Sequence, residues 1–151
     1  MPAILFVCTG NTCRSSMAEG LAKKIAREKG WTGEIWSAGV AAWPGTPATD
    51  EAIRAAAEWE VDISQHRARP LDAELVDKAD LILTMAEHHK RQILDRFPRA
   101  AGKVFTLAEY AASEEGDIPD PIGYPLEAYR ACAARLKELI EKALDRLGDN
   151  P

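Results

Sequence analysis

Residues 3–8 form a short apolar run that ends abruptly at the polar residues 9–11. Apolar residues at successive positions are typical of a strand that is buried on both faces of a parallel sheet. Beyond the polar residues, apolar side chains recur at helical spacing from Met17 to Ala26, and Gly30 is a common kind of helix stop. The sequence therefore predicts a central strand, a loop, and a helix that begins near Ser15.

The rest of the chain continues this alternation. Strands are predicted over residues 34–38, 80–85 and 103–107, and helices over residues 49–59, 71–79, 87–96 and 126–147. Residues 111–125 are polar, acidic and rich in proline, and we expect a functional loop there. Strands that alternate with helices imply a parallel sheet covered on both faces, with ligands bound beyond the carboxyl ends of the strands. We predict an α/β fold in which residues 1–151 form a single three-layer domain around a central four-stranded parallel sheet.

Charge and composition argue against several functions. The net charge is −5 over 151 residues, so no large basic face is expected for nucleic acid. The first apolar run is much shorter than a signal-peptide core or the ~20 residues of a membrane span. Three irregularly spaced cysteines do not form a secreted disulfide framework. We expect a cytoplasmic, monomeric protein that binds neither nucleic acid nor membrane.

A metal site is not predicted either. Cys8 and Cys13 have no second cysteine pair, and His88 and His89 are neighbours on a charged helix that we expect to be exposed. Cys132 lies on the apolar stripe of the last helix, where a buried structural thiol is expected. No metal or cofactor is therefore assigned.

The loop after the first strand carries the chemistry. Five residues separate Cys8 from Arg14, so a loop that curls back can aim its backbone N–H groups, the guanidinium and a helix dipole at one phosphate. The same field stabilises an anion on sulfur, which would make Cys8 a nucleophile. Gly10 and Asn11 tolerate positive φ, and Ser15 can donate a hydrogen bond to the thiolate. The predicted phosphate loop consists of Thr9, Gly10, Asn11, Thr12, Cys13, Arg14 and Ser15.

This spacing also arises by chance, and a buried thiol at a strand end is the alternative for Cys8. The position between an apolar strand and a helix favours the catalytic interpretation. Because no Gly-Lys-Ser or Gly-Lys-Thr run occurs in the sequence, a nucleotide-binding phosphate loop loses its main support.

Residues 7–19, which read V-C-T-G-N-T-C-R-S-S-M-A-E, resemble the signature of low-molecular-weight protein tyrosine phosphatases. The resemblance extends to residues 37–39, 66–69 and 79–82 and to Asp120-Pro121, and so covers essentially the whole chain. It implies hydrolysis of phosphorylated protein side chains through a phosphocysteine, with inorganic phosphate as product and competitive ligand.

The resemblance also implies roles for individual residues. In the family, the aspartate of the Asp-Pro pair protonates the leaving group; Asp120 matches it, and Asp117 is the rival. A second loop cysteine, here Cys13, can trap the nucleophile in a reversible disulfide. The family braces its strained loop asparagine with serine and histidine side chains, which implies a network of Asn11, Ser15, Ser37 and His66.

The substrate is less strongly indicated. Thr12 resembles the bacterial protein arginine phosphatases of this family, whereas tyrosine-directed members usually carry an aliphatic residue there. Ile122 occupies a place where tyrosine-directed relatives often use an aromatic ring, and Trp43 could stack on a phenyl ring or a guanidinium. We therefore expect phosphoarginine, with phosphotyrosine as the alternative.

Two more remote alternatives are an arsenate reductase and a non-catalytic phosphate-binding module. Thioredoxin-coupled arsenate reductases need a pair of shuttle cysteines near the third strand and the following helix, and residues 81–99 contain none. A binding module would need neither a nucleophile nor an acid, so Cys8 and Asp120 argue against it.

Overall fold

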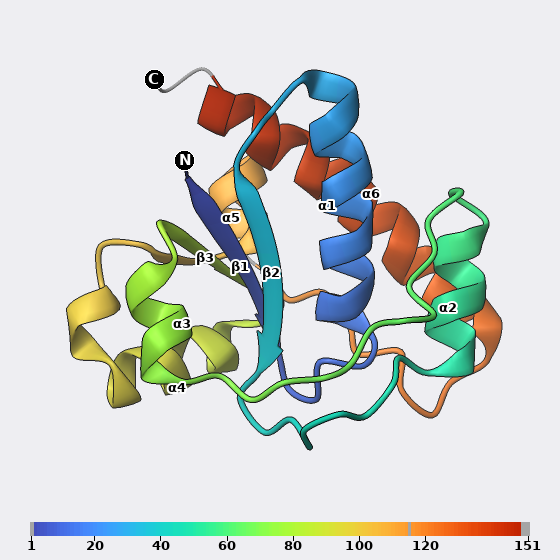
Figure 1. Cartoon of the computed structure of the whole chain (residues 1–151), viewed down its shortest axis with the longest axis horizontal. Coiled ribbons are helices and arrows are strands. Elements are labelled where there is room, and N and C mark those ends of the chain that lie inside the picture. Colours follow the sequence, from blue (N-terminus) through green and yellow to red (C-terminus); the bar gives the residue numbers. More distant parts are fainter. Residues whose placement is uncertain (1, 115, 149–151) are drawn as a thin grey trace.

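The computed structural model describes residues 2–114 and 116–148. Its strands β1 (Ala3–Cys8), β2 (Glu34–Gly39), β3 (Leu81–Thr84) and β4 (Val104–Thr106) form one sheet in the order β2-β1-β3-β4 (Figure 1). Every neighbouring pair is parallel. The predicted α/β fold with a four-stranded parallel sheet is confirmed, and β1 lies in the interior of the sheet.

Helices cover both faces of the sheet (Figure 1). One layer contains α1 (Arg14–Lys29), α2 (Asp50–Ala57), α5 (Leu107–Ala112) and α6 (Leu126–Gly148), and the other contains α3 (Ala73–Lys78), α4 (Glu87–Arg96) and the short 3₁₀ helix η1 (Pro98–Ala100). Alternate residues of β1 serve the two layers: Ile4, Phe6 and Cys8 belong to the first core, and Leu5 and Val7 to the second. This double burial explains the unbroken apolar run.

The predicted phosphate loop lies at the carboxyl edge of the sheet. Cys8, the last residue of β1, is in register with Gly39 at the end of β2, and Val7 is in register with Thr84 at the end of β3. Residues 9–13 follow β1 directly and lead into α1. The three strand ends therefore surround the loop, as expected for ligand binding in a parallel sheet.

One α-helix was not predicted. Residues 107–112 form α5, although the sequence suggested a strand to residue 107 and a loop from residue 111. A capping box starts the helix: the Thr106 hydroxyl accepts a hydrogen bond of 3.1 Å from the Glu109 amide, and the Glu109 carboxylate accepts one of 3.0 Å from the Thr106 amide. The Thr-x-x-Glu spacing is visible in the sequence and could have located the helix start.

The last helix, α6, packs on α1, α2 and α5 through the predicted apolar stripe. Its buried residues include Tyr129, Ala133, Leu136, Ile140 and Ala143. Within residues 2–114 and 116–148, no helix, including α6, has both the length and the apolar character that are needed to cross a membrane.

Candidate active site

The loop after β1 curls around the sulfur of Cys8. The backbone amide of Asn11 donates a hydrogen bond of 3.3 Å to Cys8 Sγ, and Ser15 Oγ lies 2.9 Å from the same sulfur. The thiol is almost fully buried by protein atoms but lines a pocket of about 200 Å³. The pocket is lined by Cys8, Thr9, Gly10, Thr12, Cys13, Arg14, Asp120 and Ile122.

Asn11 holds the loop in its curled form. Its φ of 59° lies in the left-handed region, which needs support in a residue other than glycine. The side-chain amide donates to Ser15 Oγ at 2.7 Å and to Ser37 Oγ at 2.9 Å. The main-chain carbonyl of Asn11 lies 2.7 Å from His66 Nε2. The structure thus brings together all four residues of the predicted network.

The direction of these hydrogen bonds bears on the sulfur. Because Asn11 donates to Ser15 Oγ, the Ser15 hydroxyl hydrogen can point at Cys8 Sγ, at 2.9 Å, which is closer than its other acceptor, the Ala38 carbonyl at 3.5 Å. Ser37 likewise accepts from Asn11 and donates to the Glu19 carboxylate. The Cys8 sulfur therefore faces two donors, the Ser15 hydroxyl and the Asn11 amide, which are placed to hydrogen-bond a sulfur anion.

Sequence reasoning missed two members of this network. The amide of Arg69 donates a hydrogen bond of 3.1 Å to Asn11 Oδ1, so the asparagine side chain is satisfied at both ends. The second is Glu19, the acceptor for Ser37. A backbone amide carries no sequence signal, whereas Glu19 lies one helical turn beyond Ser15 on α1.

Arg14 and Asp120 face each other at the pocket. Arg14 is the first residue of α1 and is 4% exposed. Its Nη1 donates to the carbonyl of Ile118 at 3.0 Å, and its Nη2 lies 3.5 Å from Asp120 Oδ2. The amide of Ile122 donates to Asp120 Oδ1 at 3.1 Å. A cation and a carboxylate that are far apart in the sequence thus meet beside Cys8.

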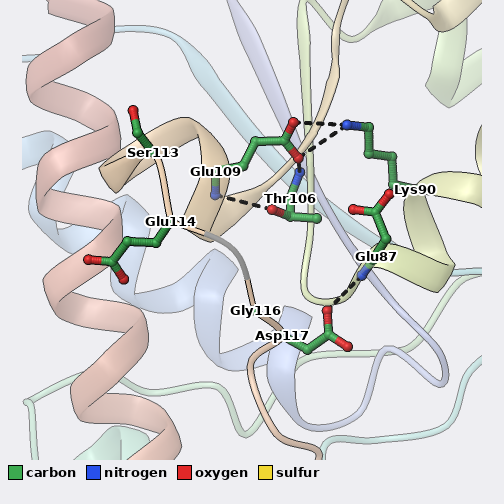
Figure 2. Close-up of a pocket in the computed structure, with 8 residues that line it drawn as sticks. All are labelled: Glu87, Lys90, Thr106, Glu109, Ser113, Glu114, Gly116 and Asp117. Atoms are coloured by element: carbon green, nitrogen blue, oxygen red, sulfur yellow. Dashed lines mark hydrogen bonds and ion pairs between the residues drawn. The ribbon is translucent and has the colours of Figure 1, made fainter.

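Asp117 has a different environment. Its Oδ1 accepts a hydrogen bond of 2.8 Å from the amide of Glu87, the first residue of α4 (Figure 2). Asp117 lines a separate cavity of about 600 Å³. The ion pair of Lys90 and Glu109 lines the side of this cavity opposite Asp117 (Figure 2). Since exposed amides at a helix N-terminus favour a carboxylate partner, the geometry explains Asp117 as a cap of α4.

His89 was wrongly expected to be exposed. His88 is exposed, but His89 is fully buried, and its Nε2 lies 2.9 Å from Thr9 Oγ1 in the phosphate loop. The buried residues Ala86, His89 and Ile93 recur at helical spacing on the face of α4 that meets the sheet. This periodicity is the signal that could have placed His89 inside.

The other two cysteines are also buried and free. Cys13 Sγ lies 3.7 Å from the hydroxyls of Tyr129 and Thr49, and burial raises the pKa of this thiol. Cys132 is buried on α6 as expected, and burial raises its pKa to about 12. The disulfide between Cys8 and Cys13 stays a prediction.

The residues predicted to contact the substrate are not all at the pocket. Thr12 and Ile122 line it. Trp43 is 80% exposed and, within the part of the chain that the structure describes, does not line it. Substrate stacking on Trp43 therefore stays a prediction.

Known proteins resemble the chain over nearly its full length. Residues 3–150 match the family described as low molecular weight phosphotyrosine protein phosphatase. A protein-arginine-phosphatase of Bacillus subtilis (strain 168) is 43% identical over 144 residues, which cover 95% of each protein. The crystal structure of a low molecular weight protein tyrosine phosphatase from T. tengcongensis is 45% identical, with a TM-score of 0.93 and coverage of 97% of this chain and 99% of that one.

A mutant of the YwlE arginine phosphatase, solved with a phosphorylated active-site serine, is similar as well. It is 41% identical with a TM-score of 0.95, and the match covers 98% of this chain and 97% of that one. Proteins named for phosphoarginine and for phosphotyrosine are thus about equally similar to the chain.

Proposed function

Since the chain belongs to the low molecular weight phosphotyrosine protein phosphatase family and is a protein phosphatase, we propose that the pocket of Cys8, Arg14 and Asp120 is its reaction centre and that phosphoarginine in proteins is its substrate. The observation that carries this proposal is the convergence of a hydrogen-bonded sulfur, a guanidinium and a carboxylate on one small pocket. Each has a distinct role in moving a phosphoryl group.

In the first step, the Cys8 thiolate attacks phosphorus, and the bond from phosphorus to the leaving nitrogen breaks. Asp120 gives a proton to that nitrogen, so arginine leaves as a stable side chain and phosphocysteine remains. Arg14 and the loop amides bind the phosphoryl oxygens, whose charge they stabilise during transfer.

In the second step, water attacks phosphocysteine. The Asp120 carboxylate accepts a proton from the water, the sulfur–phosphorus bond breaks, and inorganic phosphate leaves as product. The Ser15 hydroxyl, 2.9 Å from the sulfur, stabilises the departing thiolate. The phosphorylated serine in the related YwlE mutant supports a covalent phosphoenzyme.

The lining of the pocket supports phosphoarginine. Thr12 is half-buried there, and among the residues that the structure describes its hydroxyl has only a weak contact of 3.8 Å with Cys13 Sγ, which leaves it available to a substrate. Ile122 stands beside Asp120, and within the described residues no aromatic side chain lines the pocket. A polar hydroxyl suits a guanidinium, which carries several N–H donors, better than a phenyl ring.

Phosphotyrosine is the second candidate. The similarity of this chain to the tyrosine phosphatase from T. tengcongensis, at 45% identity, supports this second candidate. The same three residues would act, with Asp120 giving its proton to the phenol oxygen. Only the contacts beyond the phosphate would differ.

Parallel kinetics on matched peptides would test the proposal. Two peptides of one sequence, carrying phosphoarginine or phosphotyrosine at the same position, are compared by kcat/KM, with para-nitrophenyl phosphate as a reference. We expect turnover of all three and a preference for phosphoarginine. A preference for phosphotyrosine of more than tenfold would favour the second candidate, and binding without turnover would remove the reaction centre itself.

We also propose that the enzyme acts as a single-domain monomer in the cytoplasm. Cys8, Arg14 and Asp120 all come from one chain, so one copy holds the complete pocket. The three free cysteines suit a reducing compartment. Size-exclusion chromatography with light scattering would reveal a dimer if this expectation is wrong.

A further inference from the structure

Thr9, the residue after the proposed nucleophile, is held by hydrogen bonds from two sides. On the side of β2, the amides of Val40 and Ala41 donate hydrogen bonds of 2.9 Å to the carbonyls of Cys8 and Thr9. On the side of α4, the Thr9 hydroxyl lies 2.9 Å from His89 Nε2. The first peptide of the proposed phosphate loop is therefore held between the residues that follow β2 and helix α4.

The partner on α4 is an unusual choice for a buried position. His89 is fully buried, and among residues 2–114 and 116–148 its Nδ1 has no hydrogen-bond partner. A buried polar atom without a partner costs free energy, so an apolar residue here would suit packing alone better. Within the described part of the chain, the one hydrogen bond of the ring goes to Thr9 in the proposed phosphate loop.

The ring is a neutral hydrogen-bond partner. Burial and the positive charge of Arg14 lower the pKa of His89 to about 3. The imidazole therefore adds no positive charge behind the loop at neutral pH. It can accept from or donate to the Thr9 hydroxyl, depending on which nitrogen carries the proton.

We propose that His89 is a positioning residue, which fixes the peptide after Cys8 through the Thr9 hydroxyl and so holds the phosphate-binding amides in place. The inference rests on the proposed function of the pocket. It divides the bracing of the loop between two histidines: His66 bonds to the carbonyl of Asn11 in the middle of the loop, and His89 holds its beginning. Loss of the contact between His89 and Thr9 weakens the binding of a phosphate-like anion, although His89 itself does not touch the anion.

The test is a double-mutant cycle with orthovanadate as the anion. Inhibition constants are measured for wild type, Thr9→Val, His89→Leu and the double variant, against para-nitrophenyl phosphate. We expect about a fivefold weaker affinity in each single variant, the effect of losing one hydrogen bond. The double variant should be no weaker than His89→Leu, because the two residues act through one contact.

Two further variants separate positioning from packing. His89→Gln can place an amide nitrogen near the position of Nε2 and should restore most of the vanadate affinity. Gln92→Leu, which introduces the same residue at an exposed position on the same helix, is the control and should behave as wild type. Urea denaturation of every variant shows which losses reflect stability alone.

The outcomes are distinct. The positioning role is wrong if the Thr9→Val variant binds vanadate as tightly as wild type does. It is also wrong if the Thr9→Val substitution weakens vanadate affinity by the same factor in wild type and in His89→Leu. Because Thr9 is exposed, this variant remains informative even if His89→Leu does not fold. If wild type neither turns over para-nitrophenyl phosphate nor binds vanadate, the proposed function itself is wrong.

Discussion

The carboxylate of Asp120 lies 3.5 Å from the guanidinium of Arg14, and both residues line the pocket with Cys8. Asp117, three residues earlier, instead accepts a hydrogen bond from the first amide of α4. Two aspartates of one loop therefore have different tasks in the proposed mechanism. One is placed to exchange protons with the leaving group, and the other fixes the loop to the helix.

Substitution of these aspartates should separate the two tasks. We expect Asp120→Asn to lower kcat ~10²- to 10⁴-fold on phosphoarginine or phosphotyrosine peptides, which need a proton donor. With para-nitrophenyl phosphate, kcat of this variant should fall much less, because the leaving group is stable as an anion. Asp117→Ala should cost ~0.5–2 kcal/mol of stability through loss of the cap and affect all substrates alike. A selective loss in Asp117→Ala would move the acid role to Asp117.

Replacement of the proposed nucleophile, Cys8, should separate chemistry from binding. Cys8→Ser removes the thiolate but leaves Arg14 and the loop amides in place, so turnover should disappear while phosphate and vanadate still bind. Stopped assays measure turnover, and isothermal calorimetry measures phosphate binding. Activity within tenfold of wild type would exclude Cys8 as the nucleophile.

Thr12→Ile should change the substrate preference. Threonine and isoleucine are both β-branched, so the exchange alters polarity more than loop geometry. Loss of one polar contact, worth ~1–3 kcal/mol, should lower kcat/KM for phosphoarginine roughly 5- to 150-fold and leave phosphotyrosine unchanged or improved. A preference for phosphotyrosine in wild type that the substitution leaves unmoved would contradict the arginine assignment.

The three cysteines should differ sharply in reactivity. Iodoacetamide at neutral pH should modify Cys8 first, because its sulfur faces the pocket and two hydrogen-bond donors. Cys132, with a pKa of about 12, should remain unmodified in the folded protein. Peptide mass spectrometry measures both, and inorganic phosphate should protect Cys8.

Oxidation provides a related test. Brief peroxide treatment should produce a disulfide between Cys8 and Cys13 that reductant reverses. In Cys13→Ser, overoxidation should leave a larger irreversible loss of activity. Equal recovery of this variant and wild type would show that Cys13 does not protect the nucleophile.

Gly39→Ala should disturb the loop from the side of β2. A Cβ atom at residue 39 would lie 2.4 Å from the carbonyl oxygen of Thr9, which is closer than real contacts allow. The loop must then shift, and we expect a loss of vanadate affinity together with reduced stability. Gly45→Ala in the same connection would meet open space, although its φ of 83° adds a local strain. It therefore serves as the control for strain without contact.

The strand, the loop and the first turn of α1 were predictable because their signals are local. The apolar run of β1, the turn-forming residues 9–11 and the helical periodicity that follows belong to one continuous segment. Hydrogen bonding and burial within such a segment depend mainly on its own residues. The family resemblance then pointed to Asn11, Ser37 and His66 together, which the structure brings into contact.

The remaining contacts depend on how distant segments meet. Thr9 and His89 are 80 residues apart, and the Arg69 amide reaches Asn11 across 58 residues, so no spacing in the sequence connects either pair. As acidic residues of a proline-rich loop, Asp117 and Asp120 look alike by themselves, and it was the family resemblance, through Asp120-Pro121, that favoured Asp120. Only the packing of that loop against α4 and Arg14 gives one of them a helix N-terminus and the other a place at the pocket, because each carboxylate takes its role from the donors that surround it.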